Sequence, residues 1–146
     1  MRRILIAAAA AAALTMAGCA SVPMGDATQD AAAKTFKVPA GKSALYIYRN
    51  ENMGGAITMD VAVDGKPLGK TGAKTYLYAV VAPGKHVITS KAENTDTLEV
   101  LTRPGQATYV WQEVKMGFIA ARSKLQVVDE ATGRKGVAET ALAATP

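Results

Sequence analysis

The sequence predicts an all-β fold, a small antiparallel β-sandwich of about seven or eight short strands that follows an N-terminal leader. Two observations predict it. From Phe36 onward, apolar and polar residues alternate with a period of two in short runs rich in Val, Ile, Thr and Tyr. Gly, Pro, Asn and Asp separate these runs, as they do between strands. Short strands at this spacing indicate two packed sheets, immunoglobulin-like in outline.

The turns are clearest in the middle of the chain. Asp64-Gly65 fits a tight hairpin that needs positive φ, and Pro67 then predicts that the returning segment is an edge strand, because proline has no N–H for an internal ladder. Pro83-Gly84 predicts a second turn. We expect strands at 44–49, 59–64, 68–69, 75–81, 86–90, 97–102, 108–114 and 125–129.

Four segments are expected along the 146 residues. Residues 1–18 are a signal peptide, 19–34 a flexible tether, 35–133 the β-sandwich domain and 134–146 a C-terminal tail that is either frayed or docked on the domain. The tether is predicted from its Ala, Ser, Pro, Gly and Asp content, which carries little apolar periodicity. A chain of this length is expected to form one domain.

The leader has the pattern of an export signal. Arg2 and Arg3 precede an uncharged run, Ile4–Ala17, of 14 residues, which is shorter than the roughly 20 residues needed to span a bilayer. The run ends in Leu-Thr-Met-Ala-Gly-Cys at 14–19, which resembles the lipobox of bacterial lipoproteins. The resemblance implies cleavage before Cys19 and acylation, with palmitate-type chains, of the new terminus.

Cys19 is the one cysteine of the sequence, so it cannot form an internal disulfide. Two or more acyl chains hold a protein stably on a membrane, whereas one chain does not. The next residues are Ala20 and Ser21, and the absence of aspartate after the cysteine resembles enterobacterial lipoproteins that pass to the outer membrane. We therefore expect an outer-membrane lipoprotein of the cell envelope that faces the periplasm.

Two stretches carry a further resemblance. Residues 61–71, VAVDGKPLGKT, followed by 81–88, VAPGKHVI, are similar to a PEGA-type β module. The order from the lipobox through LYIYR at 45–49 and these turns to YVWQ at 109–112 resembles a family of bacterial lipoproteins that is a domain of unknown function. The resemblance covers about residues 21–133 and implies a compact β-sandwich, without a reaction, ligand or active-site residue.

The net charge is too small to indicate a nucleic-acid-binding protein. Without the two leader arginines the net charge falls from +5 to +3, and the lysines are spread among turns, so we expect no nucleic-acid partner. A surface module for anionic lipid or lipopolysaccharide is the alternative to a protein or glycan partner. It would use lysines that could gather at one end of the sandwich, namely Lys66, Lys70, Lys74 and Lys85.

No catalytic constellation is found in the sequence. His86 is the single histidine, and a metal site or catalytic triad would need partner ligands that the sequence lacks. We expect no enzyme activity, no metal and no cofactor. A hydrolase of envelope material that pairs His86 with a carboxylate is the less favoured alternative.

Aromatic residues spaced by two place rings on one side of three strands. Such rings either pack in a core or form a surface for sugars or a partner, and the sequence does not separate these alternatives. The expected function is a membrane-anchored, non-catalytic binding or structural module for an envelope protein or cell-wall glycan. The rings concerned are Tyr46, Tyr48, Tyr76, Tyr78, Tyr109 and Trp111.

Overall fold

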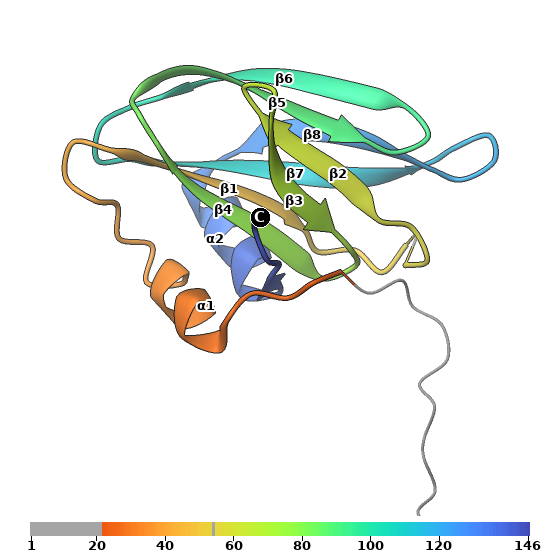
Figure 1. Cartoon of the computed structure of the whole chain (residues 1–146), viewed down its shortest axis with the longest axis horizontal. Coiled ribbons are helices and arrows are strands. Elements are labelled where there is room, and N and C mark those ends of the chain that lie inside the picture. The colour runs from red at the N-terminus through yellow and green to blue at the C-terminus, as the bar shows by residue number, and fades with distance from the viewer. Residues whose placement is uncertain (1–21, 54) are drawn as a thin grey trace, which may run out of the picture.

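The computed structural model describes residues 22–53 and 55–146, so the predicted signal peptide and Cys19 lie outside the described residues. The predicted β-sandwich is confirmed (Figure 1). One sheet has the strand order β8-β7-β1-β4-β9 and the other has the order β3-β2-β5-β6. Helices α1 and α2 lie on the side of the larger sheet that faces away from the smaller one (Figure 1).

Strands β1 to β8 agree with the sequence-based expectation to within a few residues, except that the β7–β8 hairpin is longer than expected, and β9, in the predicted C-terminal tail, was not expected. The larger sheet contains β1 (Ser43–Arg49), β4 (Thr75–Val81), β7 (Ala107–Met116), β8 (Ala121–Val128) and β9 (Ala141–Leu142). The smaller sheet contains β2 (Met59–Val63), β3 (Lys66–Thr71), β5 (Gly84–Lys91) and β6 (Thr95–Thr102).

The expectation of purely antiparallel pairing is corrected at two places. β1 pairs with β7 in parallel, and β4 pairs with the short β9 in parallel. Parallel neighbours require a crossover connection, and the long excursion from β1 through the smaller sheet to β7 supplies one. The turn predictions are confirmed. Asp64 and Gly65 have φ of 52° and 78°, and β3, which contains Pro67, is an edge strand.

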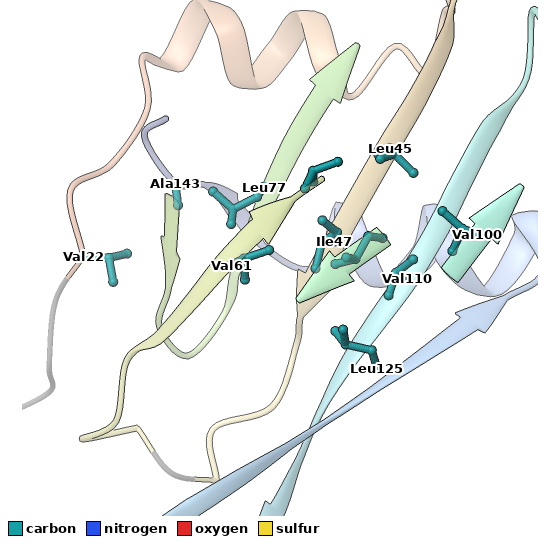
Figure 2. Close-up of a cluster of buried hydrophobic side chains, with 11 residues drawn as sticks. Val22, Leu45, Ile47, Val61, Leu77, Val100, Val110, Leu125 and Ala143 are labelled. Atoms are coloured by element: carbon teal, nitrogen blue, oxygen red, sulfur yellow. The ribbon is translucent and has the colours of Figure 1, made fainter. Parts of the chain in front are cut away.

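The main core lies between the two sheets (Figure 2). Leu45 and Ile47 on β1 meet Val61 on β2 and Val110 on β7, and each of these side chains is at most 2% exposed. Every residue of β1 is buried, because the opposite side of this strand is covered as well. β1 therefore joins two cores, one on each side of the larger sheet.

The predicted flexible tether over 19–34 is wrong for its described part. Val22 is 7% exposed and packs in the main core, and α1 (Ala27–Ala33) follows it. Asp26 begins this helix, since its carboxylate accepts the Thr28 N–H at 2.6 Å. An alanine-rich stretch with a good N-cap forms a helix once it has a surface to pack on.

The predicted boundary at residue 133 is also corrected. α2 (Glu130–Ala138) begins at Asp129, which caps the Thr132 N–H at 2.8 Å, so the helix crosses that boundary. β9 then pairs with β4, and Ala144 N–H donates to the Pro23 carbonyl at 2.8 Å. The domain therefore includes both the start and the end of the described chain, and the tail is docked rather than frayed.

Candidate functional site

The aromatic rings converge as the strand spacing predicts, but beneath the helices. Tyr46 and Tyr109 stack at 5.1 Å between ring centroids, and Tyr46 lies 4.9 Å from the Tyr78 ring. Four rings, Tyr46, Tyr48, Tyr76 and Tyr109, are at most 2% exposed. Tyr78 and Trp111 are half-buried at the edge of the same cluster. The rings thus form a second core, which is the core-packing alternative of the sequence analysis.

Hydrogen bonds fix this core to α1. The Tyr46 hydroxyl donates to the Ala33 carbonyl at 2.8 Å, and the Tyr76 hydroxyl donates to an Asp30 carboxylate oxygen at 2.7 Å. Burial raises the pKa of Tyr46 and of Tyr76, so both phenols stay neutral donors at physiological pH. Both hydroxyls donate to groups of α1, so neither is free to bind a ligand.

His86 joins the β2–β3 turn to β5. Its Nδ1 lies 2.6 Å from an Asp64 carboxylate oxygen, and its Nε2 lies 2.6 Å from the Ala82 carbonyl oxygen. Both partners only accept hydrogen bonds, so the pair of contacts requires a proton on each nitrogen, which is the imidazolium form. No ring nitrogen is left to take a proton from a substrate while these bonds are made.

The pKa shifts at this pair agree with the geometry. Burial of the ring lowers the pKa of His86, but the bonds to Asp64 and Ala82 and the nearby carboxylate charge together raise it above its ordinary value. The hydrogen bond from His86 is the largest cause that lowers the pKa of Asp64, and the Val87 N–H adds to it. This charged hydrogen bond holds the β2–β3 turn against β5.

The lysines named in the sequence analysis do not form one patch. Lys66 and Lys70 lie at opposite ends of β3, opposite Val63 and Asp60 respectively. Lys70 pairs with Asp60 at 2.8 Å, and Lys85 at the start of β5 lies 3.6 Å from Glu99. Lys74 lies beyond the end of β3, in the turn before β4.

A groove of about 580 Å³ runs over β2, β3 and β5 and is bordered by the C-terminal residues. Ala62, Thr89 and Gly69 line it, and Pro23 and Pro146 lie at its border. The groove is lined mainly by apolar and small side chains. It joins segments from both ends of the chain, so no local sequence pattern predicted it.

One side of the groove is charged. Asp60 on β2 lies between Lys70 on β3 and Lys91 on β5 in the strand register, and all three side chains line the groove. Two ammonium groups around one carboxylate leave an excess positive charge. This side of the groove suits a carboxylate or other anion.

A second hollow of about 420 Å³ lies on the other side of the C-terminal segment. Tyr78, Lys37 and Gln29 line it, and Ala144 and Thr145 border both hollows. Tyr78 is the one aromatic residue predicted from the sequence that lines this second hollow. The segment 144–145 forms a ridge between the two hollows.

The end of the sandwich near the β1–β2 loop is polar inside. Gln112 Nε2 donates to Ser90 Oγ at 2.7 Å, and Thr71 Oγ1 donates to Gln112 Oε1 at 2.5 Å. Ser123 Oγ donates to Ser90 Oγ at 2.7 Å, and buried Arg49 donates to the Ile57 carbonyl at 2.7 Å. These bonds link five strands and a loop, which is a structural role.

Within residues 22–53 and 55–146, no three His, Cys, Asp or Glu side chains are grouped so as to hold a metal ion. None of the helices described here has the length and apolar character to span a bilayer.

Comparison with known proteins gives a family without an assigned function. The model of the family "Protein of unknown function (DUF2846)" matches residues 39–124. An "Uncharacterized protein" from Haemophilus influenzae (strain ATCC 51907 / DSM 11121 / KW20 / Rd) is 32% identical over 134 residues, which cover 90% of this chain and 79% of that protein. No solved structure matches the chain. The resemblance to a family of unknown function is thereby confirmed, and the chain belongs to the DUF2846 family.

Proposed function

We propose that the chain is a lipid-anchored, non-catalytic binding module of the bacterial envelope, which holds a segment of an envelope protein in the groove over β2, β3 and β5. The anchor is the acylated Cys19 of the lipobox-like sequence, and the outer membrane is its expected location. The likeness of residues 61–88 to a PEGA-type module fits a non-catalytic role.

One observation carries the proposal, which is the position of the groove at the start of the domain. Pro23 borders the groove, and it lies only four positions after Cys19 in the sequence. An extended chain covers at most about 3.6 Å per residue, so Pro23 lies within about 15 Å of the proposed lipid attachment. A ligand in the groove would thus be held close to the membrane surface.

The lining favours a polypeptide over a glycan. Among the described lining residues there is no aromatic ring on which a sugar could stack, whereas small apolar side chains cover most of the surface. The charged side with Lys70 and Lys91 suits an acidic side chain or a terminal carboxylate of the partner. We therefore expect an apolar segment with one acidic group.

Photocrosslinking in cells tests this function. A photoreactive amino acid at Ala62, inside the groove, should capture one specific envelope protein, and the same amino acid at exposed Lys42 should not. The substitution Thr89→Trp should fill the groove and reduce the capture. Capture of a glycan fragment, or the same products from both positions, would contradict the proposal.

A further inference from the structure

The tip of the β7–β8 hairpin carries the most exposed apolar side chains described in this protein. Met116, Phe118 and Ile119 are 83%, 95% and 90% exposed. They lie within four consecutive positions, and in Figure 1 the hairpin extends beyond the sheets at one end of the domain. Scattered single apolar residues on a surface are ordinary, but a contiguous exposed cluster marks a contact site.

The tip is held in a fixed conformation while its side chains face solvent. The Glu93 carboxylate, from the neighbouring β5–β6 turn, accepts N–H bonds from Phe118, Ile119 and Ala120 at 2.8, 3.1 and 2.7 Å. The bonds from Ala120 and Ile119 are the largest causes that lower the pKa of Glu93, so it remains ionised. The exposure of the apolar side chains is therefore a feature of an ordered loop.

Cations stand directly behind the apolar tip. Lys115 and Arg122 lie opposite each other in the hairpin register, and Lys124 lies two pairs further back, opposite Glu113. All three side chains are exposed. Three carboxylates lie near these cations: Glu93 binds the loop amides, Glu113 binds Lys115 at 2.6 Å, and Glu51 accepts the Val114 N–H at 2.9 Å. The hairpin thus ends in an apolar cap, and exposed cationic side chains of its own two strands lie behind that cap.

This arrangement matches the interface of an anionic bilayer. Apolar side chains enter the boundary between headgroups and acyl chains, while lysine and arginine stay among the negative headgroups. The tip projects as a convex point, which enters lipid readily and would otherwise need a concave partner. We propose that the β7–β8 tip inserts into the anionic bilayer surface as a second membrane contact beside the lipid on Cys19. This inference depends on the proposed anchoring for the nearness of the membrane.

A fluorescent probe on the native lipidated protein tests the insertion. The variant Ile119→Cys, labelled with an environment-sensitive nitrobenzoxadiazole dye, is reconstituted in vesicles that contain phosphatidylglycerol. We expect blue-shifted emission and quenching by lipids that carry doxyl groups. The matched control is Leu101→Cys, because Leu101 is also an exposed apolar residue, at 58%, but lies on β6 away from the tip. Its dye should stay in water and escape quenching.

Further variants separate the two parts of the inference. Phe118→Ser should reduce the quenching at position 119 severalfold without changing the thermal midpoint, since the replaced side chain is exposed. Lys115→Glu with Arg122→Glu should reduce it in phosphatidylglycerol vesicles, as should added salt. Equal quenching in vesicles of phosphatidylcholine alone would overturn the anionic preference. Absence of quenching at position 119, or its protection by a co-purified protein instead of lipid, would overturn the insertion.

Failure of the anchor is recognised separately. Cys19 is the one cysteine of the sequence, so dye uptake by the chain without an added cysteine reports an unmodified sulfur. Uptake there would contradict the lipidation and leave the tip to be judged by sedimentation of the same chain with phosphatidylglycerol vesicles. The proposed anchor and the proposed tip thus fail by different results.

Discussion

The docking of α2 on the aromatic core gives the sharpest prediction for stability. A methyl group added at Gly133 would lie 2.7 Å from Cδ1 of Tyr109 and closer still to Cγ and Cβ of that side chain. Apolar carbons normally approach to about 3.5–4.0 Å, so the helix would have to move by about 1 Å or more. The clash is with the base of the Tyr109 side chain, which cannot swing away.

Two effects of opposite sign determine the outcome of Gly133→Ala. Helix propensity alone would stabilise the protein by about 1 kcal/mol, because alanine replaces glycine inside a helix. Overpacking a close contact costs about 1–3 kcal/mol, and a rigid contact of this kind belongs at the upper end. We therefore expect a net loss of about 2 kcal/mol in the free energy of unfolding.

Urea unfolding followed by Trp111 fluorescence measures this change, because Trp111 packs at the edge of the same core. Lys135→Ala, at an exposed position on the same helix, is the control and should stay within about 0.5 kcal/mol of the parent. Gly136→Ala should cost less than Gly133→Ala, since its added methyl meets the far edge of the Tyr48 ring. A Gly133→Ala protein as stable as the parent would refute the close docking of α2.

Three further predictions concern polar contacts. Stability from the Asp64–His86 pair should be complete between about pH 4 and 6.5, decline as pH rises through the raised pKa of His86 and decline as pH falls through the lowered pKa of Asp64. In urea titrations at several pH values, His86→Ala should abolish the decline above about pH 6.5 and weaken the decline at low pH, where the Val87 N–H still lowers the pKa of Asp64; the same pH dependence in the parent and in His86→Ala would contradict the pairing. Gln112→Leu should destabilise the domain by about 2 kcal/mol in urea, because the buried Thr71 hydroxyl loses its acceptor and Ser90 Oγ loses one of its two donors, and an unchanged midpoint would argue against the network. Glu93→Gln should speed hydrogen exchange of the amides at 118–120 while the sheet amides stay protected; unchanged rates would show that the carboxylate does not order the tip.

The strands could be predicted because their signals are local. Alternation with a period of two marks β1 and β2, and Asp64-Gly65 fixes the hairpin between β2 and β3 by a conformation that few residues adopt. The sequence did not decide whether the tyrosines of β1 are buried or exposed, because tyrosine occurs both in cores and on surfaces. The tyrosines are buried because α1 and α2 pack over that side of the strand.

Neither helix had a strong signal of its own. α1 and α2 have 7 and 9 residues, which is too short for a helix that is stable alone. α2 also contains Gly133 and Gly136, which disfavour helix but allow its close approach to Tyr109 and Tyr48. Tertiary packing therefore determines these elements, and the local sequence argues against one of them.

The candidate surfaces were missed for a related reason. The groove combines Pro23, three strands and the C-terminal residues, which only the folded chain brings together. At the β7–β8 tip, an apolar stretch directly after a strand gives the same pattern as a buried one. Its position between Lys115 and Arg122 with Gly117 inside was the available sign of an exposed turn.

Mass spectrometry of the native protein, extracted from membranes with detergent, tests the anchoring most directly. If Cys19 is the lipid anchor, the mature chain starts at Cys19 and its N-terminal peptide carries the mass of a diacylglyceryl group on sulfur and an acyl group on the amine. A chain that retains residues 1–18, or one whose Cys19 sulfur is unmodified, would contradict it.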